Sequence, residues 1–153
     1  MQEFTAEVTI RQPVARVFTW LTTAGNHPKW DKSSLGMECL TPGPWKKGTC
    51  FREQRLMGSR KVDVLSEIIA FKPNELFVVK SRTGPGWLGT WQFHDIPEGT
   101  RLKWSAQFRM YGIGRLFEGL IAGKIRKAIG PQFGALPAII EAELNESEAD
   151  ITS

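Results

Sequence analysis

The chain has 153 residues, of which 41% are hydrophobic and 24% charged, a composition typical of one globular domain with a sizeable core. No apolar run reaches the roughly 18 residues that a membrane span requires, and the N-terminal residues lack the pattern of a secretory signal. We therefore expect a cytoplasmic protein without stable membrane insertion. The net charge of +4 favours anionic partners only weakly. Cys39 and Cys50 are too few for a disulfide framework or a zinc set, and both are expected to be reduced thiols.

The N-terminal part predicts one strand followed by two short helices. Apolar and polar residues alternate over residues 3–10, which is typical of a half-buried strand. Pro13 suits the first turn of the helix that apolar spacing predicts over residues 14–21. Asn26 can cap a second short helix that extends to Trp30.

Six further strands are expected in the middle of the chain, separated by turns rich in Gly, Pro and Asn. They are assigned to residues 35–40, 49–57, 60–71, 76–83, 87–96 and 101–110. Helical spacing then continues to about Leu144, and the acidic segment 146–153 is expected to be a disordered tail. An antiparallel sheet with one apolar face has to be covered, and the last helix is the only element long enough to do so. A single domain over residues 1–145 is therefore expected.

Several stretches, in their order and spacing, carry a family likeness that spans nearly the whole chain. They are VTIRQPVARVFTWLTT, HPKW, GPWKKGTCFRE, EIIAFKPNELFVVKSRTGP, GTWQF…EGTRLKW and a last helix ending in LPAIIEAE. This order resembles the START / polyketide cyclase-dehydrase superfamily (SRPBCC), whose helix-grip fold also occurs in pollen allergens. The resemblance implies an α+β fold with a curved antiparallel sheet of about seven strands around a long C-terminal helix, and a cavity between them. It also implies binding or carrying of hydrophobic small molecules, with cyclisation or dehydration in some members, but no universal catalytic motif.

The last helix departs from this likeness at Gly130-Pro131 and at Gly134 and Pro137. A proline inside a helix costs about 3 kcal/mol or more and bends the axis. A single straight closing helix is therefore not expected.

Motifs for cofactor, metal or general-base chemistry find little support. GPGWLG over residues 84–89 matches a dinucleotide fingerprint, but a strand follows it where the fingerprint needs a helix, so its glycines are assigned to a turn. His94 has the polar parity of its strand, and His27, which the resemblance places near the cavity mouth, would need an orienting partner to act as a base. No His/carboxylate cluster has ligand spacing on one face. No cofactor and no metal are predicted.

Large aromatic residues share one face of two neighbouring strands. Parity places Trp87, Trp91 and Phe93 on the same face as Trp104 and Phe108 of the next strand. This face is either a filled core or the wall of a pocket. We favour the pocket, because a curved sheet and one helix leave a wedge of space and indole N–H groups supply the few donors that such a pocket uses.

Two cations could anchor a ligand at this pocket. The strand over residues 49–57 carries charge on both parities, so it is either an edge strand, which we favour, or it directs Arg52 into the cavity. On the last helix, Lys124 falls within an apolar arc that includes Phe117, Ile121 and Ile125. The methylene groups of Lys124 can lie along the apolar surface while its ammonium group reaches water, or the ammonium group can pair with the anionic head group of a ligand.

The sequence thus predicts a helix-grip protein that binds a hydrophobic or aromatic small molecule, lipid- or polyketide-like, between the sheet and the last helix. The predicted ligand-binding residues are Trp30, Arg52, Trp87, Trp91, Phe93, Trp104, Phe108, Phe117, Ile121, Lys124 and Ile125.

Two other functions are left open. One is an enzyme of the polyketide cyclase or aromatase type, in which Arg52, Lys124 or Tyr111 would polarise a carbonyl group, with catalytic residues unassigned. The other is a basic module that binds nucleic acid or docks on a membrane surface through the basic amphipathic last helix. The sequence has no helix-turn-helix and no basic aromatic platform, so no nucleic-acid partner is expected. We expect a monomer or a homodimer.

Overall fold

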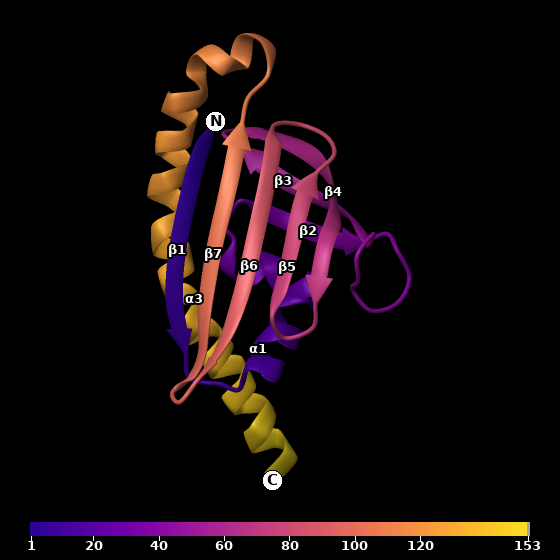
Figure 1. The fold of residues 1–153 in the computed structure, drawn as a ribbon, viewed down its shortest axis with the longest axis vertical. Coiled ribbons are helices and arrows are strands. Elements are labelled where there is room, and N and C mark those ends of the chain that lie inside the picture. Colours follow the sequence, from indigo (N-terminus) through magenta and orange to yellow (C-terminus); the bar gives the residue numbers. More distant parts are fainter. Residues whose placement is uncertain (153) are drawn as a thin grey trace.

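The computed structural model describes residues 1–152, with side chains described through residue 149. Seven strands form one antiparallel sheet in the order β1-β7-β6-β5-β4-β3-β2 (Figure 1). The strands are β1 (Gln2–Ile10), β2 (Ser34–Cys39), β3 (Cys50–Met57), β4 (Arg60–Lys72), β5 (Leu76–Ser81), β6 (Gly86–Ile96) and β7 (Gly99–Arg109). The helices are α1 (Val14–Leu21), α2 (His27–Trp30) and α3 (Glu118–Thr152), with 3-10 helices η1 (Ala24–Asn26) and η2 (Gly112–Phe117).

The predicted α+β helix-grip fold is confirmed. β2 and β3 run across the direction of β1 and β7, so the sheet is strongly curved, and α3 lies along β1 (Figure 1). The strands begin and end within two residues of the predicted ranges. Strand boundaries were predictable here because Gly, Pro and Asn turns separate clear alternating runs.

The register of β6 and β7 gathers the aromatic residues. Trp91 lies opposite Trp104, Trp87 lies opposite Phe108, and Gly89 falls between the two tryptophans of β6. Because side chains of paired residues point to the same face, the alternation in sequence places these rings together.

α3 is one continuous helix even though Pro131 and Pro137 lie inside it. Figure 1 shows that its axis runs along β1 and then turns diagonally past α1. Each proline removes one backbone donor and crowds the preceding turn, which bends a helix without necessarily ending it. The predicted departure from a straight helix is therefore seen as a bend in α3, and the helix does not break.

The end of α3 differs from the expected disordered tail. Residues 146–152 continue the helix, while residue 153 lies outside the described residues. Arg16 of α1 forms an ion pair with Glu148 and donates a hydrogen bond to the Leu144 carbonyl oxygen at 3.2 Å. These contacts with α1 give the last turns a partner that local sequence pattern does not reveal.

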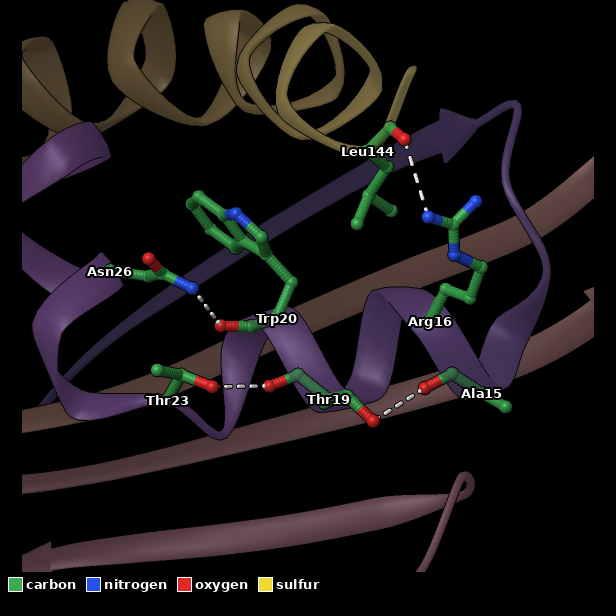
Figure 2. Close-up of a pocket in the computed structure, with 7 residues that line it drawn as sticks. All are labelled: Ala15, Arg16, Thr19, Trp20, Thr23, Asn26 and Leu144. Carbon is green, nitrogen blue, oxygen red and sulfur yellow. Dashed lines mark hydrogen bonds between the residues drawn. The ribbon is translucent and has the colours of Figure 1, made fainter. Parts of the chain in front are cut away.

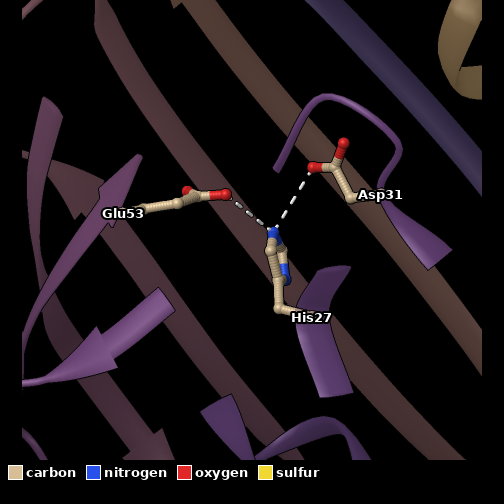
Figure 3. Close-up of side chains that lie close together, drawn as sticks. All are labelled: His27, Asp31 and Glu53. Atoms are coloured by element: carbon tan, nitrogen blue, oxygen red, sulfur yellow. Dashed lines mark ion pairs between the residues drawn. The ribbon is translucent and has the colours of Figure 1, made fainter. Parts of the chain in front are cut away.

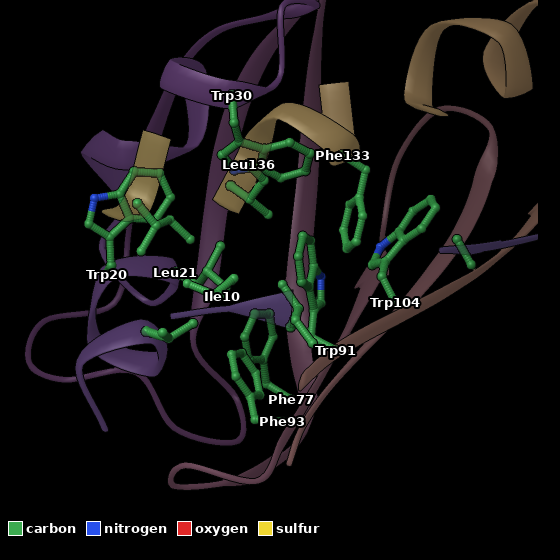
Figure 4. Close-up of a cluster of buried hydrophobic side chains, with 14 of the residues drawn as sticks. Ile10, Trp20, Leu21, Trp30, Phe77, Trp91, Phe93, Trp104, Phe133 and Leu136 are labelled. Atoms are coloured by element: carbon green, nitrogen blue, oxygen red, sulfur yellow. The ribbon is translucent and has the colours of Figure 1, made fainter. Parts of the chain in front are cut away.

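The core lies where the middle of α3 meets the sheet and α1 (Figure 4). Leu136 and Ile140 of α3 are fully buried and Phe133 is 2% exposed. Their spacing of three and four residues places them on one face of the helix. They pack in the same cluster as Ile10 of β1 and Leu102 of β7, both fully buried. Within the described residues, no helix is both long and apolar enough to cross a membrane.

Candidate functional site

Three indoles of the predicted site lie together with the phenyl ring of Phe133, a residue of α3 that was not predicted. The ring centroids of Trp91 and Trp104 are 6.2 Å apart, and those of Trp87 and Trp104 are 6.0 Å apart. Phe133 of α3 lies over this pair, with its centroid 6.0 Å from Trp91 and 5.9 Å from Trp104 (Figure 4). These separations lie within the range of favourable tilted aromatic packing.

The aromatic layer continues across the sheet toward α1 and α2. Phe77 of β5 stacks on Trp91 at 5.6 Å, and Trp30 of α2 contacts the same indole edge-on at 5.5 Å. Phe18 of α1 meets Phe93 at 5.0 Å. The concave face is therefore one connected set of rings contributed by several elements and closed by α3.

Most of the predicted pocket wall is brought together in this layer. The residues that are at least nine-tenths buried are Trp30, Trp91, Phe93, Trp104 and Phe108. Trp87, Ile121 and Ile125 are half-buried and pack against the same cluster. The rings contact one another across the space between sheet and helix. A ligand-binding role for these residues therefore stays a prediction.

Arg52 lies away from this layer, and the expectation that its strand is an edge strand is wrong. β3 is paired on both sides, by β2 and β4. The side chain of Arg52 is 55% exposed and lies 3.9 Å from Glu38 on the outer face. The inward parity of β3 instead belongs to Phe51, Glu53 and Arg55.

Phe117 and Lys124 are also separated from the aromatic layer. Phe117 is 54% exposed, Lys124 is exposed, and Leu116 and Leu120 are 82% and 65% exposed. Figure 1 shows why: η2 and the first turns of α3 extend past the end of β7, where no strand lies beneath them. Tyr111, the third residue considered for carbonyl polarisation, is 66% exposed.

A cluster of four charged side chains lies between α2 and β3, where sequence reasoning expected none. His27 Nε2 is 3.3 Å from Asp31 Oδ2 and 3.2 Å from Glu53 Oε1 (Figure 3). Arg55 Nη1 lies 3.0 Å from the same Asp31 oxygen and 2.7 Å from the same Glu53 oxygen. Two cations thus face two carboxylates, and the side chain of His27 is only 23% exposed. We call these four residues the charge cluster.

The charge cluster holds His27 in its protonated form. Burial lowers the pKa of His27, but hydrogen bonding and attraction to Asp31 and Glu53 outweigh burial and raise the pKa to about 9. Burial raises the pKa of Asp31 and Glu53, but His27 and Arg55 outweigh it and hold both values below their usual range. An imidazole that is protonated at neutral pH cannot act as a general base.

The donor atoms of His27, Asp31 and Glu53 lie within 4.8 Å of one another, which is close enough to hold a metal ion. Arg55 already neutralises both carboxylates, and a protonated imidazole has no lone pair on Nε2 to offer. We therefore assign an ion-pair role to the cluster. The spacing of His27 and Asp31 at i and i+4 was visible in the sequence, but the approach of β3 was not.

Two surface hollows lie away from the aromatic layer. One, of about 420 Å³, is open to solvent between α1 and the end of α3, and is lined by Arg16, Thr19, Trp20 and Leu144 among others (Figure 2). Its hydroxyl groups donate to nearby helical carbonyls, as Thr19 does to Ala15 at 2.9 Å. The other, of about 200 Å³, lies on the opposite face of the sheet. The second hollow is lined by side chains of the outward parity of β1, β6 and β7, among them Thr5, Thr90 and Ser105.

A curved antiparallel sheet closed over an aromatic face by a long C-terminal helix defines a helix-grip protein. The chain belongs to the family described as "Polyketide cyclase / dehydrase and lipid transport", whose model matches residues 1–141. No curated protein matches the sequence.

Solved structures share this fold at low sequence identity. TTHA0849 from Thermus thermophilus is 20% identical, with a TM-score of 0.77 over 93% of this chain and 99% of that one. The Zhui aromatase/cyclase from Streptomyces sp. R1128 is 12% identical, with a TM-score of 0.73 over 93% of this chain and 92% of that one. Ara h 8.0201 is 16% identical, with a TM-score of 0.66 over 92% of this chain and 98% of that one. At these identities the likeness establishes the fold alone.

Proposed function

We propose that the protein binds a hydrophobic, ring-bearing small molecule against the aromatic face of β6 and β7, beneath α3. The observation that carries this proposal is that Trp91 and Trp104 lie side by side and that one α3 side chain, Phe133, covers both. A planar ligand ring that takes the place of the Phe133 ring would lie against both indoles in the same way. The family description, which includes polyketide cyclases and lipid transport, supports a ligand of this kind.

The ligand enters most readily from the Trp87 end of the layer. Trp87 itself is half-buried, and Ile121 and Ile125 in the first part of α3 are half-buried too, whereas Leu136 and Ile140 further along the helix are fully buried. Fewer buried apolar contacts mean that this part of α3 separates from the sheet at lower cost.

The first test uses N-phenyl-1-naphthylamine, a neutral polycyclic probe, and follows the quenching of tryptophan emission. Saturable binding with a Kd in roughly the micromolar range is expected, and Trp91→Leu is expected to weaken it by about tenfold or more, because the variant removes the central ring of the layer. Trp20→Phe is the matched control. Its indole donates to Glu143 on the far side of the core, so its loss should leave the affinity for the probe unchanged. Absence of saturable binding, or equal affinities of wild type and Trp91→Leu, contradicts the proposed function.

An exposed apolar surface at the start of α3 favours a second candidate function, exchange of the ligand at an anionic lipid bilayer. Ile113, Leu116 and Leu120 are 80%, 82% and 65% exposed, which is unusual for three large apolar side chains within eight residues. The exposed cations around them are Arg109, Arg115, Lys124 and Lys127. Apolar side chains flanked by cations match the interface of a bilayer that carries negative head groups.

Sedimentation with lipid vesicles tests this second function. We expect the protein to bind vesicles of phosphatidylglycerol at least about tenfold more strongly than vesicles of phosphatidylcholine, and the double variant Leu116→Ser, Leu120→Ser to lose this binding. The control variant Leu35→Ser, Leu40→Ser removes two apolar side chains that are 42% and 41% exposed elsewhere. Equal losses in the two double variants, or no preference for the anionic vesicles, would count against a membrane role.

A further inference from the structure

Three indole nitrogens surround one point on the sheet. The position that a Cβ atom would take on Gly89 lies 3.4 Å from Trp87 Nε1, 3.7 Å from Trp104 Nε1 and 3.9 Å from Trp91 Nε1. Figure 4 shows the nitrogens of Trp91 and Trp104 on edges that face one another. Three hydrogen-bond donors from two strands thus converge above a residue that has no side chain.

These three donors have no acceptor within the described residues. The one indole that donates a hydrogen bond there is Trp20, whose Nε1 lies 3.0 Å from Glu143 Oε2. Trp91 and Trp104 are only 7% and 5% exposed as whole residues, but their Nε1 atoms are not among the fully buried side-chain atoms that lack a partner, so each nitrogen keeps some accessible surface. Indole N–H groups inside a protein usually find an acceptor, so donors that keep accessible surface but have no acceptor in the described part of the protein are open to an acceptor from a ligand.

Neither the backbone nor the packing requires glycine at position 89. Its φ lies outside the left-handed region, and an added Cβ would make only ordinary van der Waals contacts with its nearest neighbours, the three nitrogens. Glycine is also unfavourable inside a strand and often marks a place where another group approaches the backbone. The absence of a side chain leaves free the space in which the three donors converge.

We infer that Trp87, Trp91 and Trp104 bind the carbonyl oxygen of an aromatic ketone above Gly89. This inference rests on the proposed function and defines the polar group of its ligand. The donors are neutral, so they match a neutral carbonyl oxygen, whereas a carboxylate would lose its hydration without gaining a cation from these three side chains. A ketone fused between aromatic rings places that oxygen at the edge of a planar apolar body, which suits the layer of rings around it.

Fluorenone and fluorene provide a direct test, because they differ at one position, a carbonyl group in place of a methylene group. Affinities are measured by displacement of N-phenyl-1-naphthylamine. We expect wild type to bind fluorenone about tenfold or more tightly than fluorene. In the Gly89→Ala variant a methyl group occupies the acceptor position, and in the triple variant Trp87→Phe, Trp91→Phe, Trp104→Phe the donors are lost while aromatic rings remain. Both variants are expected to bind the two compounds equally.

Gly36→Ala in β2 is the matched control, since no atom lies within 4 Å of its added Cβ and the residue lies outside the aromatic layer. It should keep the preference for fluorenone. A second readout is the ¹⁵N–¹H spectrum of the indoles, assigned with the single Trp→Phe variants. The signals of Trp87, Trp91 and Trp104 should move downfield with fluorenone and not with fluorene.

The outcomes separate the two proposals. If both compounds bind equally to wild type and the indole signals do not move downfield, the carbonyl site is wrong while the proposed function stands. If neither compound nor the probe binds, both proposals are wrong. Preference for fluorenone that persists in Gly89→Ala would place the acceptor elsewhere and would also overturn the inference.

Discussion

Replacing Phe133 by alanine is expected to lower the free energy of unfolding by about 4 kcal/mol and to raise the affinity for N-phenyl-1-naphthylamine by about tenfold. Phe133 is 2% exposed and its ring lies within 6.4 Å, centroid to centroid, of Trp30, Trp91 and Trp104. Its removal leaves a cavity lined by aromatic rings, and apolar cavities stay dry and bind apolar molecules. Urea unfolding and probe titration measure the two effects.

The control variant Leu136→Ala distinguishes the loss of stability in Phe133→Ala from its gain in probe affinity. Leu136 is fully buried on the same face of α3, one turn further on, and its loss should cost a comparable free energy of about 3 kcal/mol. It has no ring over the two indoles, so probe affinity should remain that of wild type. If Phe133→Ala does not fold, Phe133→Leu gives the same comparison at a smaller cost. A rise of probe affinity in both variants would indicate loosened packing and would contradict a site defined by Phe133.

The aromatic residues that β6 and β7 contribute to the site could be predicted from the sequence, because their position depends only on the alternation of side chains along each strand. In β6, Trp87, Trp91 and Phe93 share one parity, and the turn before β7 brings Trp104 and Phe108 to the same face. This conclusion needs only the period of two that defines a strand. What the sequence could not show is that these rings would contact one another and Phe133 so closely, since packing depends on the curvature of the whole sheet.

The part of α3 that lies over the aromatic face could not be predicted in this way, because its position depends on tertiary structure. Residues 116–129 and residues 133–140 both carry apolar residues at helical spacing, so periodicity alone cannot rank them. The choice is decided by where the sheet ends: β7 stops at Arg109, and the chain needs η2 and several turns of α3 before the helix lies over the strands again. Phe117 is therefore exposed while Phe133 is buried.

The charge cluster also depends on tertiary structure. Alternation in β3 is ambiguous because both parities carry charge, and reading inward from Phe51 would have selected Glu53 and Arg55 instead of Arg52. Buried ion pairs gain little over apolar packing, but removal of one member leaves its partners uncompensated. Ion pairs of the charge cluster link the short helix α2 to β3. The free energy of unfolding should therefore depend on whether His27 is protonated.

His27→Gln is expected to lower the free energy of unfolding by about 2 kcal/mol near pH 6, with the loss decreasing toward pH 9. The pKa of His27 is raised from 6.5 to about 9 in the folded protein. Its stabilising contribution is therefore complete below about pH 6.5 and is lost as the pH rises through about 9. The full shift corresponds to about 3 kcal/mol, and partial exposure of the side chain reduces this by solvent screening.

At acidic pH, Asp31 and Glu53 make stability depend on pH in the opposite direction. The pKa values of Asp31 and Glu53 are lowered in the folded protein, so their contributions are present above their unfolded values of 3.8 and 4.5 and are lost as the pH falls below them. Urea unfolding at about pH 6, 7.5 and 9 isolates the contribution of His27, because both carboxylates stay ionised throughout this window. His94→Gln, at the other histidine, which is exposed on β6, is the control for the loss of an imidazole outside the charge cluster. A loss in His27→Gln that stays constant from pH 6 to pH 9 would mean that His27 is not protonated in the folded protein, and the cluster would then be held by Arg55 alone.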